Sequence, residues 1–421
     1  MRRSLWIAWV VACGCGSPAG NDVDTATDTD EPASSGSSDA ATTDTAAADG
    51  DTDDADATAS ATTNGDVDGD DDDDGSTGGC EGAECGGGTP TLLWTTIADD
   101  NYGDGFCQSV TGDGEGGMFA SYLGYGWETY SDVFAVDGSG QVTGRGSGAE
   151  AVSYVDLATR GPGLFDWAAA SGQVGIADAG LTNLDGGMLA FDVDQIRAMV
   201  RGPDALQYVV RTTPTFQCVV RSGTDSMADS LPFPCAPNFS EEALLLDDLG
   251  NRYYVEPHAY RVRRVDPAGL AYGSVDGRWN RVGLDAAVDP DGNLWVVGAI
   301  GSDPSDVYGG FVARHAFDLA APPPFEDAVE GPVVWTSVSM TSHGPIVFGH
   351  EGYGEYMHVR GLDFDGTTRW RWSQEVMPQI YVNETAIDTD GNLLACGYRF
   401  SGELTPVGSD IHHPLFMKFE L

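Results

Sequence analysis

Two short turns carry side-chain oxygens that could bind a metal ion. Both read Asp-x-Asp-Gly-Asn, and alternating carboxylate and amide oxygens are the ligands that calcium takes in proteins. The candidate ligands are Asp289, Asp291, Asn293, Asp388, Asp390 and Asn392. The same pattern is typical of a tight connection between two strands, in which Asp caps the turn and Gly takes a positive φ. The sequence favours the strand connection, and calcium is the one cofactor it suggests.

No catalytic residue can be assigned from the sequence. The chain lacks the Gly-x-Ser-x-Gly elbow, the His-Glu-x-x-His helix, the P-loop and the dinucleotide fingerprint. Adjacent His412 and His413 fall in a segment that we expect to be a loop, and we expect surface positions for the histidines. An enzyme built on this chain would have to assemble its site from scattered residues.

Cysteines beyond the N-terminal segment predict disulfides. Cys80 and Cys85 bracket a four-residue loop, and Cys218 with Cys235 would close a hairpin. An even number of cysteines is typical of an exported protein in an oxidising compartment. Neither pair has the Cys-x-x-Cys spacing, so zinc and thioredoxin-like chemistry have little support.

The elements that must position these residues are strands in a regular repeat. From residue 91 onward, short runs of alternating apolar and polar residues are separated by Gly, Pro and Asp turns. The repeated turns fall at positions 116, 163, 204, 250, 292, 344 and 391, between 41 and 52 residues apart. This period with short strands is typical of propeller blades, so we predict an all-β, seven-bladed β-propeller of four-stranded blades over residues 91–421.

The last repeat needs a strand from elsewhere in the chain. Each unit adds a third strand and a fourth after a second turn, and we place Trp335, Trp370 and Trp372 on these outer strands. The seventh unit has only three strands before Leu421. We expect residues 91–96 to supply its fourth strand and so close the ring.

The repeat has a family resemblance. Asp-x-Asp-Gly-Asn, followed by an apolar strand, Leu-Asp-x-x-Gly and Trp, resembles the seven-bladed propeller repeats of bacterial lipoproteins and, more distantly, quinoprotein-type repeats. The resemblance covers residues 91–421. Most units lack the outer Trp, and seven units replace the eight of quinoproteins, so a quinone cofactor is not implied. The resemblance implies an architecture and leaves the chemistry open.

The N-terminus predicts export and lipidation. Two arginines precede an apolar run from Leu5 to Ala12, as in a secretory signal, and this run is too short to span a bilayer. Val-Val-Ala-Cys ending at Cys13 resembles a lipobox, which implies a signal peptide over 1–12 and acylation of Cys13. Gly14 then implies the outer membrane, on its periplasmic face or at the cell surface. An ordinary signal peptide, or acylation at Cys15, is the alternative.

An acidic tether should separate this anchor from the propeller. Residues 13–90 consist mainly of Asp, Thr, Ser, Ala and Gly, a composition that cannot bury enough apolar surface to fold. The whole chain has a net charge of −46, and residues 86–421 alone hold 45 acidic and 18 basic side chains. Such a charge repels phosphate backbones and excludes nucleic-acid binding.

We therefore expect a monomeric, lipid-anchored propeller that serves as a binding or scaffold module for a protein or glycan. Aromatic residues in Gly-rich loops of units one and six could contact such a ligand. These are Tyr122, Tyr125, Trp127, Tyr353 and Tyr356. The alternative is a propeller enzyme, a calcium-dependent lyase or lactonase-like hydrolase. A quinone-dependent dehydrogenase is a third hypothesis, which the number of units disfavours.

Overall fold

The computed structural model describes residues 90–98 and 105–421, with gaps in the second range. The gaps are 126–128, 148–153, 170, 172, 182–186, 189–194, 203–204, 213–216, 223–232, 235–242, 257–259, 269–270, 276–280, 302–306, 317–318, 320–322, 324, 332, 352–353, 377 and 405–409. The predicted signal peptide, the predicted acylation site Cys13, the predicted tether up to residue 89, and Cys80, Cys85 and Cys235 lie outside the described residues.

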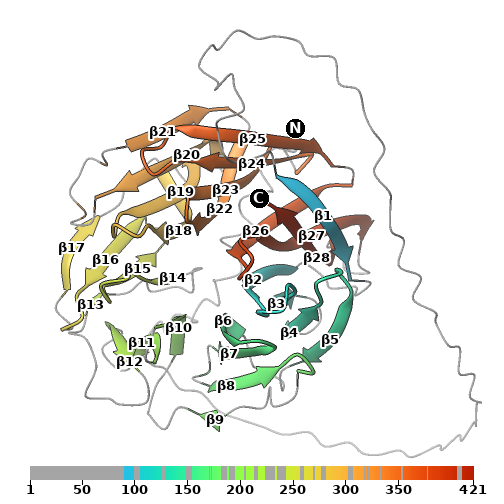
Figure 1. Cartoon of the computed structure of the whole chain (residues 1–421), viewed down its shortest axis with the longest axis horizontal. Helices are drawn as coiled ribbons and strands as arrows, with labels where there is room; N and C mark the ends of the chain where they lie inside the picture. Colours follow the sequence, from blue (N-terminus) through green and yellow to red (C-terminus); the bar gives the residue numbers. More distant parts are fainter. Residues whose placement is uncertain are drawn as a thin grey trace, which may run out of the picture. The chain divides into compact units, whose positions relative to one another are not determined.

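Seven antiparallel sheets of four strands each are arranged in a ring, as predicted (Figure 1). Blade one comprises β2 (Gly105–Gly112), β3 (Met118–Tyr125), β4 (Thr129–Val136) and β5 (Val142–Ser147). Blade two comprises β6 (Tyr154–Gly161), β7 (Leu164–Ala169), β8 (Gln173–Asp178) and β9 (Gly187–Met188). Blade three comprises β10 (Gln195–Arg201), β11 (Leu206–Thr212), β12 (Gln217–Ser222) and β13 (Phe233–Pro234).

The other four blades complete the ring. Blade four comprises β14 (Ala243–Leu246), β15 (Arg252–Glu256), β16 (Arg261–Val265) and β17 (Ala271–Val275). Blade five comprises β18 (Arg281–Val288), β19 (Leu294–Gly301), β20 (Val307–His315) and β21 (Phe325–Glu330). Blade six comprises β22 (Val333–Thr341), β23 (Gly344–Glu351), β24 (Tyr356–Leu362) and β25 (Thr368–Glu375). Blade seven comprises β26 (Ile380–Ile387), β27 (Leu393–Leu404), β28 (Asp410–Glu420) and β1 (Thr91–Ile97).

The inner strands are β2, β6, β10, β14, β18, β22 and β26, and consecutive inner strands contact one another around the ring (Figure 1). Apolar side chains on the faces of neighbouring sheets then pack between the blades. One such cluster joins Phe348 and Val359 of blade six to Leu415 and Phe419 of blade seven. The core is therefore a series of layers between blades. Among the described residues, no helix is long and apolar enough to cross a membrane.

Glycines define the turns between the first and second strands, at the predicted positions. Six of the seven predicted turn positions are glycines with φ between 64° and 126°, and the seventh, residue 204, lies outside the described residues. Gly292 and Gly391 end turns in which the backbone carbonyl of Asp289 or Asp388 accepts the glycine N–H. Because only glycine adopts this backbone region without strain, the spacing of these turns was readable from the sequence.

Trp335 is the exception to the predicted placement of tryptophans. Trp370 and Trp372 lie on β25, an outer strand as predicted, but Trp335 lies on the inner strand β22. Its ring packs towards blade five, where a Cβ at Gly310 would come within 2.9 Å of it. The prediction for Trp335 was wrong because inner and outer strands of a blade have similar apolar sequence patterns.

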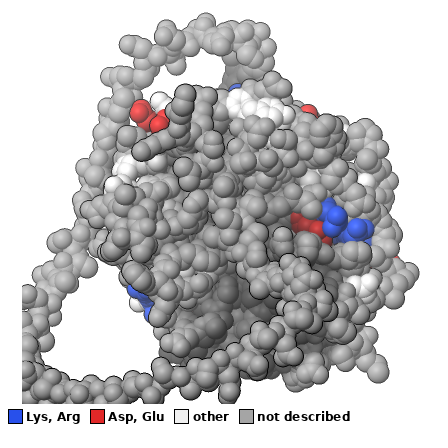
Figure 2. Space-filling view, turned by 180° about the vertical axis from the view of Figure 1, so that it is seen from behind, with Lys and Arg blue, Asp and Glu red and all other residues white. Residues whose placement is uncertain are grey.

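Buried ion pairs connect strands within and between blades. Asp166 of blade two is fully buried and binds Arg160 of its own blade at 2.7 Å and Arg201 of blade three. Arg360 of blade six similarly reaches Asp327 of blade five. Described acidic and basic side chains also lie next to one another on the face shown in Figure 2. The basic side chains are thus largely distributed to meet acids.

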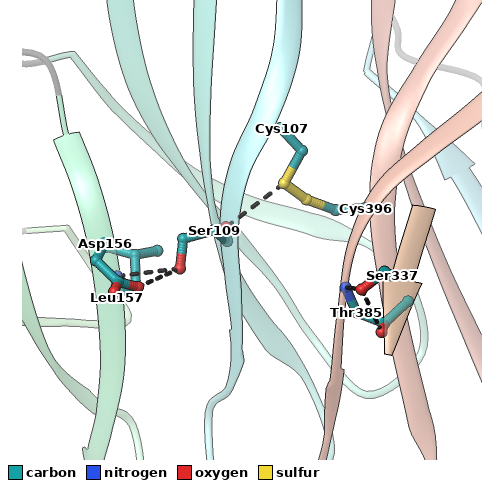
Figure 3. The surroundings of a disulfide bond; sticks show 7 residues. All are labelled: Cys107, Ser109, Asp156, Leu157, Ser337, Thr385 and Cys396. Atoms are coloured by element: carbon teal, nitrogen blue, oxygen red, sulfur yellow. Dashed lines mark hydrogen bonds between the residues drawn. A yellow bond between two sulfur atoms is a disulfide. The ribbon is translucent and has the colours of Figure 1, made fainter. Parts of the chain in front are cut away.

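Ring closure uses both a shared blade and a covalent bond. β1 pairs with β28 antiparallel from Thr91–Glu420 to Ile97–Leu415, as predicted. In addition, a disulfide joins Cys107 of blade one to Cys396 of blade seven, 289 residues apart in sequence (Figure 3). The sequence did not predict this pair. Cys218 is also disulfide-bonded, and its pairing with Cys235 stays a prediction.

Candidate binding site at the junction of blades six, seven and one

A hydrogen-bonded belt of inner-strand side chains holds the centre of the ring together. In Figure 3 the Ser109 hydroxyl lies beside Asp156 of the next inner strand and donates to its Oδ1 at 2.8 Å. Ser109 Oγ also accepts the Leu157 N–H at 3.1 Å. Asp156 Oδ2 in turn accepts the Met199 N–H of blade three at 3.1 Å. Each side chain therefore caps a backbone N–H of the following blade.

The same contact recurs across the ring. Asp285 Oδ2 of blade five accepts the Val338 N–H of blade six at 2.8 Å, and Ser337 Oγ accepts the Thr385 N–H of blade seven at 3.1 Å. These belt residues follow a β-bulge in their inner strands. A bulge leaves part of the strand ladder unpaired, and here the preceding blade supplies the acceptor.

Burial in this belt changes the acidity of Asp156. The Asp156 residue is partly exposed, but protein atoms surround its carboxyl group. This desolvation raises the pKa of the carboxyl group to about 6. Hydrogen bonds from Ser109, Met199 N–H and Leu157 N–H oppose the shift because they favour the charged form. Asp156 is therefore a group whose charge changes in mildly acidic conditions.

Aromatic rings cluster where the strands of blade seven begin or end on one face of the ring. Tyr398 stacks on His412 with centroids 4.3 Å apart and on Tyr381 at 5.1 Å. Phe400 meets His412 edge-on at 4.6 Å, and His350 of blade six meets Tyr381 at 4.8 Å. We call these five residues the ring cluster. It brings blade six and blade seven together with polar nitrogens among apolar rings.

His412 corrects the expectation for the adjacent histidines. His412 and His413 lie on β28 and not in a loop, and His412 is buried. His412 Nδ1 lies 3.0 Å from the Gly105 nitrogen and 2.9 Å from the Gly105 oxygen of blade one, so either tautomer has a partner. Strand β28 includes both histidines because His413 pairs with Arg399 of β27 across the sheet.

Two buried carboxamide oxygens near the ring cluster have no hydrogen-bond partner. They are Oε1 of Gln108 and Oδ1 of Asn383. Each residue occupies the bulge of its inner strand, β2 or β26, and these two strands are neighbours. Asn383 is two residues from Tyr381 of the ring cluster. A buried acceptor without a donor costs about 1–3 kcal/mol, so these oxygens call for hydroxyl or amine donors from a ligand or water.

Three nitrogens at the junction of blades six and seven also lack a hydrogen-bond partner. They are Nε of Arg399, Nδ1 of His413 and Nδ1 of His350. Burial and, to a smaller extent, the neighbouring His358 lower the pKa of His350 to about 4. His350 is thus neutral at neutral pH. The junction offers one guanidinium N–H and two imidazole nitrogens without an acid to meet them among the described residues.

A Ser–His–Glu arrangement lies on the outer part of blade six. Ser373 Oγ is 2.9 Å from His358 Nδ1, and His358 Nε2 is 3.3 Å from Glu351 Oε2. His358 and Ser373 are cross-strand partners on β24 and β25. This order of hydroxyl, imidazole and carboxylate is that of a nucleophile, its base and an orienting acid. Ser373 is exposed.

The predicted calcium ligands lie in turns whose first carboxylates are already engaged. Asp289 Oδ1 accepts the Asn293 N–H at 2.8 Å, and Oδ2 lies 2.9 Å from Asn293 Nδ2. Asp388 accepts from Asn392 in the same way, and Lys418 Nζ lies 2.8 Å from its Oδ2. No group of three or more His, Cys, Asp or Glu suited to a metal occurs in the described part of the chain. Asp291 and Asp390 lie exposed in the same turns.

The predicted aromatic contacts are not brought together. Tyr122 is fully buried and meets Phe134 edge-on at 6.5 Å, so it belongs to the core of blade one. Tyr356 is 38% exposed on blade six and remains accessible to a ligand. Trp127, Tyr353 and the side chain of Tyr125 lie outside the described residues. The ring cluster, which the sequence did not single out, uses other aromatic residues.

Comparison with known proteins supports the fold only. No family model matches the chain, and no curated protein matches it. Virginiamycin B lyase from Staphylococcus aureus aligns with a TM-score of 0.52 and 9% identity, covering 79% of this chain and 100% of that one. A chain of the mitotic checkpoint complex aligns with a TM-score of 0.52 and 11% identity, covering 77% and 91%. The likeness is one of fold.

One signal in the sequence could have revealed the belt. The position four residues before each first turn is polar in five blades. These residues are Ser109, Asp156, Ala198, Ala243, Asp285, Ser337 and Glu384. Counting back from the glycine turns would have identified them. The ring cluster gives no comparable signal, because it depends on side-chain directions at the strand ends.

Proposed function

We propose that this protein is a lipid-anchored module of the bacterial outer membrane that binds a glycan. The N-terminal sequence supports the anchor at Cys13, and the acidic tether would display the propeller away from the membrane. The unpartnered acceptor oxygens of Gln108 and Asn383, on the neighbouring inner strands β2 and β26, carry the proposal. Sugars present many hydroxyl donors and apolar C–H faces, which amide oxygens and aromatic rings recognise.

The net charge of the folded part narrows the choice of ligand. Residues 86–421 hold 45 acidic against 18 basic side chains, which disfavours densely charged polyanions. A glycan with few charges meets no such barrier. A protein ligand would more typically need an exposed apolar patch, and the large exposed apolar side chains of the described residues are spread over six blades, with Leu164 and Ile176 of blade two the one pair that shares a blade.

Glycan-array screening of the full chain, followed by calorimetry on the best binder, tests this proposal. The variant with Gln108→Leu and Asn383→Leu should bind at least tenfold more weakly, since it removes both acceptors while keeping their volume. Gln374→Leu, on the exposed part of β25, is the matched control and should bind as the unmodified protein does. Binding that is unaffected by the double change, or no glycan bound at all, would contradict the proposal.

A hydrolase is the second candidate, and the Ser373–His358–Glu351 arrangement favours it. A serine activated by this histidine would attack an ester or lactone carbonyl. Ser373→Ala should then abolish hydrolysis of a p-nitrophenyl ester by the full chain, whereas Ser401→Ala should not. Equal rates for Ser373→Ala and the unmodified protein would exclude this role.

A further inference from the structure

The junction of blades six and seven contains a cross-strand pair of basic side chains. Arg399 on β27 and His413 on β28 are register partners, so their side chains lie on the same face of the sheet. Leu415 and Met417 follow His413 at alternate positions and pack against Ile346 and Phe348 of blade six. By the same alternation, Arg399 and His413 are on the face directed at blade six.

His350 enters the same junction from the opposite blade. It is the register partner of Met357, which packs in the cluster between blades six and seven. Its contact with Tyr381 places the imidazole against blade seven. One guanidinium and two imidazoles therefore approach one junction from two sides.

These groups are left without acids in a protein that is rich in them. Arg145, Arg261 and Arg360 each have a carboxylate within ion-pair distance. Arg399 has none within the described residues, and its Nε, like the Nδ1 atoms of His413 and His350, is buried without a hydrogen-bond partner. Buried donors without acceptors are rare in native proteins, and a bound ion, ligand or water is the usual explanation.

We propose that Arg399, His413 and His350 bind a carboxylate group of the ligand, so that the glycan contains an acidic sugar. This inference rests on the proposed glycan-binding function. A guanidinium binds a carboxylate through two parallel N–H bonds, and imidazole N–H groups can donate to its outer lone pairs. Tyr381, which contacts His350, would lie beside the sugar ring, whereas Tyr398, Phe400 and His412 alternate with Arg399 and His413 and so lie on the face directed at blade one. A single carboxylate fits the overall charge of the protein better than a phosphate or sulfate polymer.

Calorimetry on the full chain with a matched pair of ligands tests this inference. The probes are a trisaccharide that carries one galacturonate and its methyl ester, which differ by one charge and one methyl group, together with the corresponding glucuronate pair. The acid form of one sugar should bind at least tenfold more tightly than its ester. Arg399→Gln should remove that difference, and so should His413→Gln. The matched control Arg371→Gln, at an exposed position of β25, should preserve it.

Each outcome separates this inference from the proposed function. Equal binding of acid and ester forms that still depends on Gln108 and Asn383 would keep the glycan function and overturn the carboxylate site. An unchanged preference in Arg399→Gln would also overturn it, provided that the variant melts at the temperature of the unmodified protein. A site that binds an acidic peptide and no uronate would overturn both. No binding of any uronate oligomer overturns the inference.

Discussion

Arginine side chains have acidic partners at one junction between blades and lack them, among the described residues, at another. Between blades two and three, the buried carboxylate of Asp166 meets both Arg160 and Arg201. Between blades six and seven, Arg399 meets no acid within the described residues, and His350 and His413 bring further nitrogens without partners. The first junction is complete as packing, and the second is complete only with an external acceptor. Charge pairing thus separates a structural junction from a candidate binding site in this ring of similar blades.

Covalent closure lies beside the incomplete junction. The disulfide Cys107–Cys396 joins blades one and seven, and the β1–β28 pairing completes blade seven. A site with unsatisfied polar atoms needs rigid support, because those atoms lower the stability of the surrounding structure. We infer that the closure compensates for the cost of the open junction. Removing either element should therefore affect the two junctions differently.

The largest expected effect comes from removing the disulfide. Cys107→Ser combined with Cys396→Ser should lower the free energy of unfolding by about 2–5 kcal/mol, because the unfolded chain loses a cross-link that closes a very long loop. Urea unfolding of both proteins measures the loss. The unmodified protein in reductant should lose at least as much, because reduction also breaks the disulfide of Cys218. Equal stability of all three samples would show that the β1–β28 pairing suffices for closure.

The stability of the junction between blades two and three should depend on Asp166, the acid that both arginines contact. Asp166→Asn should destabilise the protein by about 2–3 kcal/mol, since both arginines lose their buried partner but are themselves about one-third exposed. The control Asp363→Asn, whose side chain is half exposed beside Arg369, should cost less than about 1 kcal/mol. Arg399→Gln should cost less than Arg201→Gln. The reverse order would remove the distinction between the junctions.

The raised pKa of Asp156, a belt residue, predicts that the stability of the folded protein depends on pH. Its folded pKa of about 6 lies above the ordinary value of 3.8, so the folded state holds this proton more tightly than the unfolded state. Asp156 therefore favours folding below about pH 4, and this contribution is lost as the pH rises through 6. Asp156→Asn should show a flatter fall of melting temperature between pH 4 and 6. Parallel curves for both proteins would contradict the predicted shift.

Calcium should have the smallest effect. Calcium binding at Asp289 or Asp388 would have to displace the contacts with Asn293 or with Asn392 and Lys418. We expect the melting temperature to change by less than about 1 °C between millimolar calcium and excess chelator. A site occupied at about 100 times its dissociation constant would add about 2.7 kcal/mol and raise it clearly. Such a rise would favour the calcium interpretation of the turns and the enzyme hypothesis.

The fold was predictable because its turns are encoded locally. Glycine at positions such as Gly292 and Gly391 marks a backbone conformation that other residues adopt only with strain, so the blade period is visible in one sequence. The use of residues 91–96 to close blade seven followed from counting strands. By contrast, Trp335 was misplaced because inner and outer strands have similar apolar patterns.

The candidate site could not be predicted because it depends on contacts distant in sequence. Cys107 and Cys396 are 289 residues apart, and no local pattern pairs them. His412 and Gly105 are equally remote, and β-bulges shift which inner-strand residues contact one another. Side-chain pairing between blades is set by the three-dimensional ring and not by the period of the repeat.

The position of β1 determines how the propeller would respond to a pulling force. Force transmitted through residue 90 enters β1 at Thr91, where its pairing with Glu420 is the first contact to break. The pairs with β28 would then separate one after another towards Ile97, which is a low-force route compared with shearing a whole strand at once. The next covalent restraint along the chain is Cys107, joined to Cys396. The disulfide would thus stop the peeling after one strand and leave the other six blades intact under load.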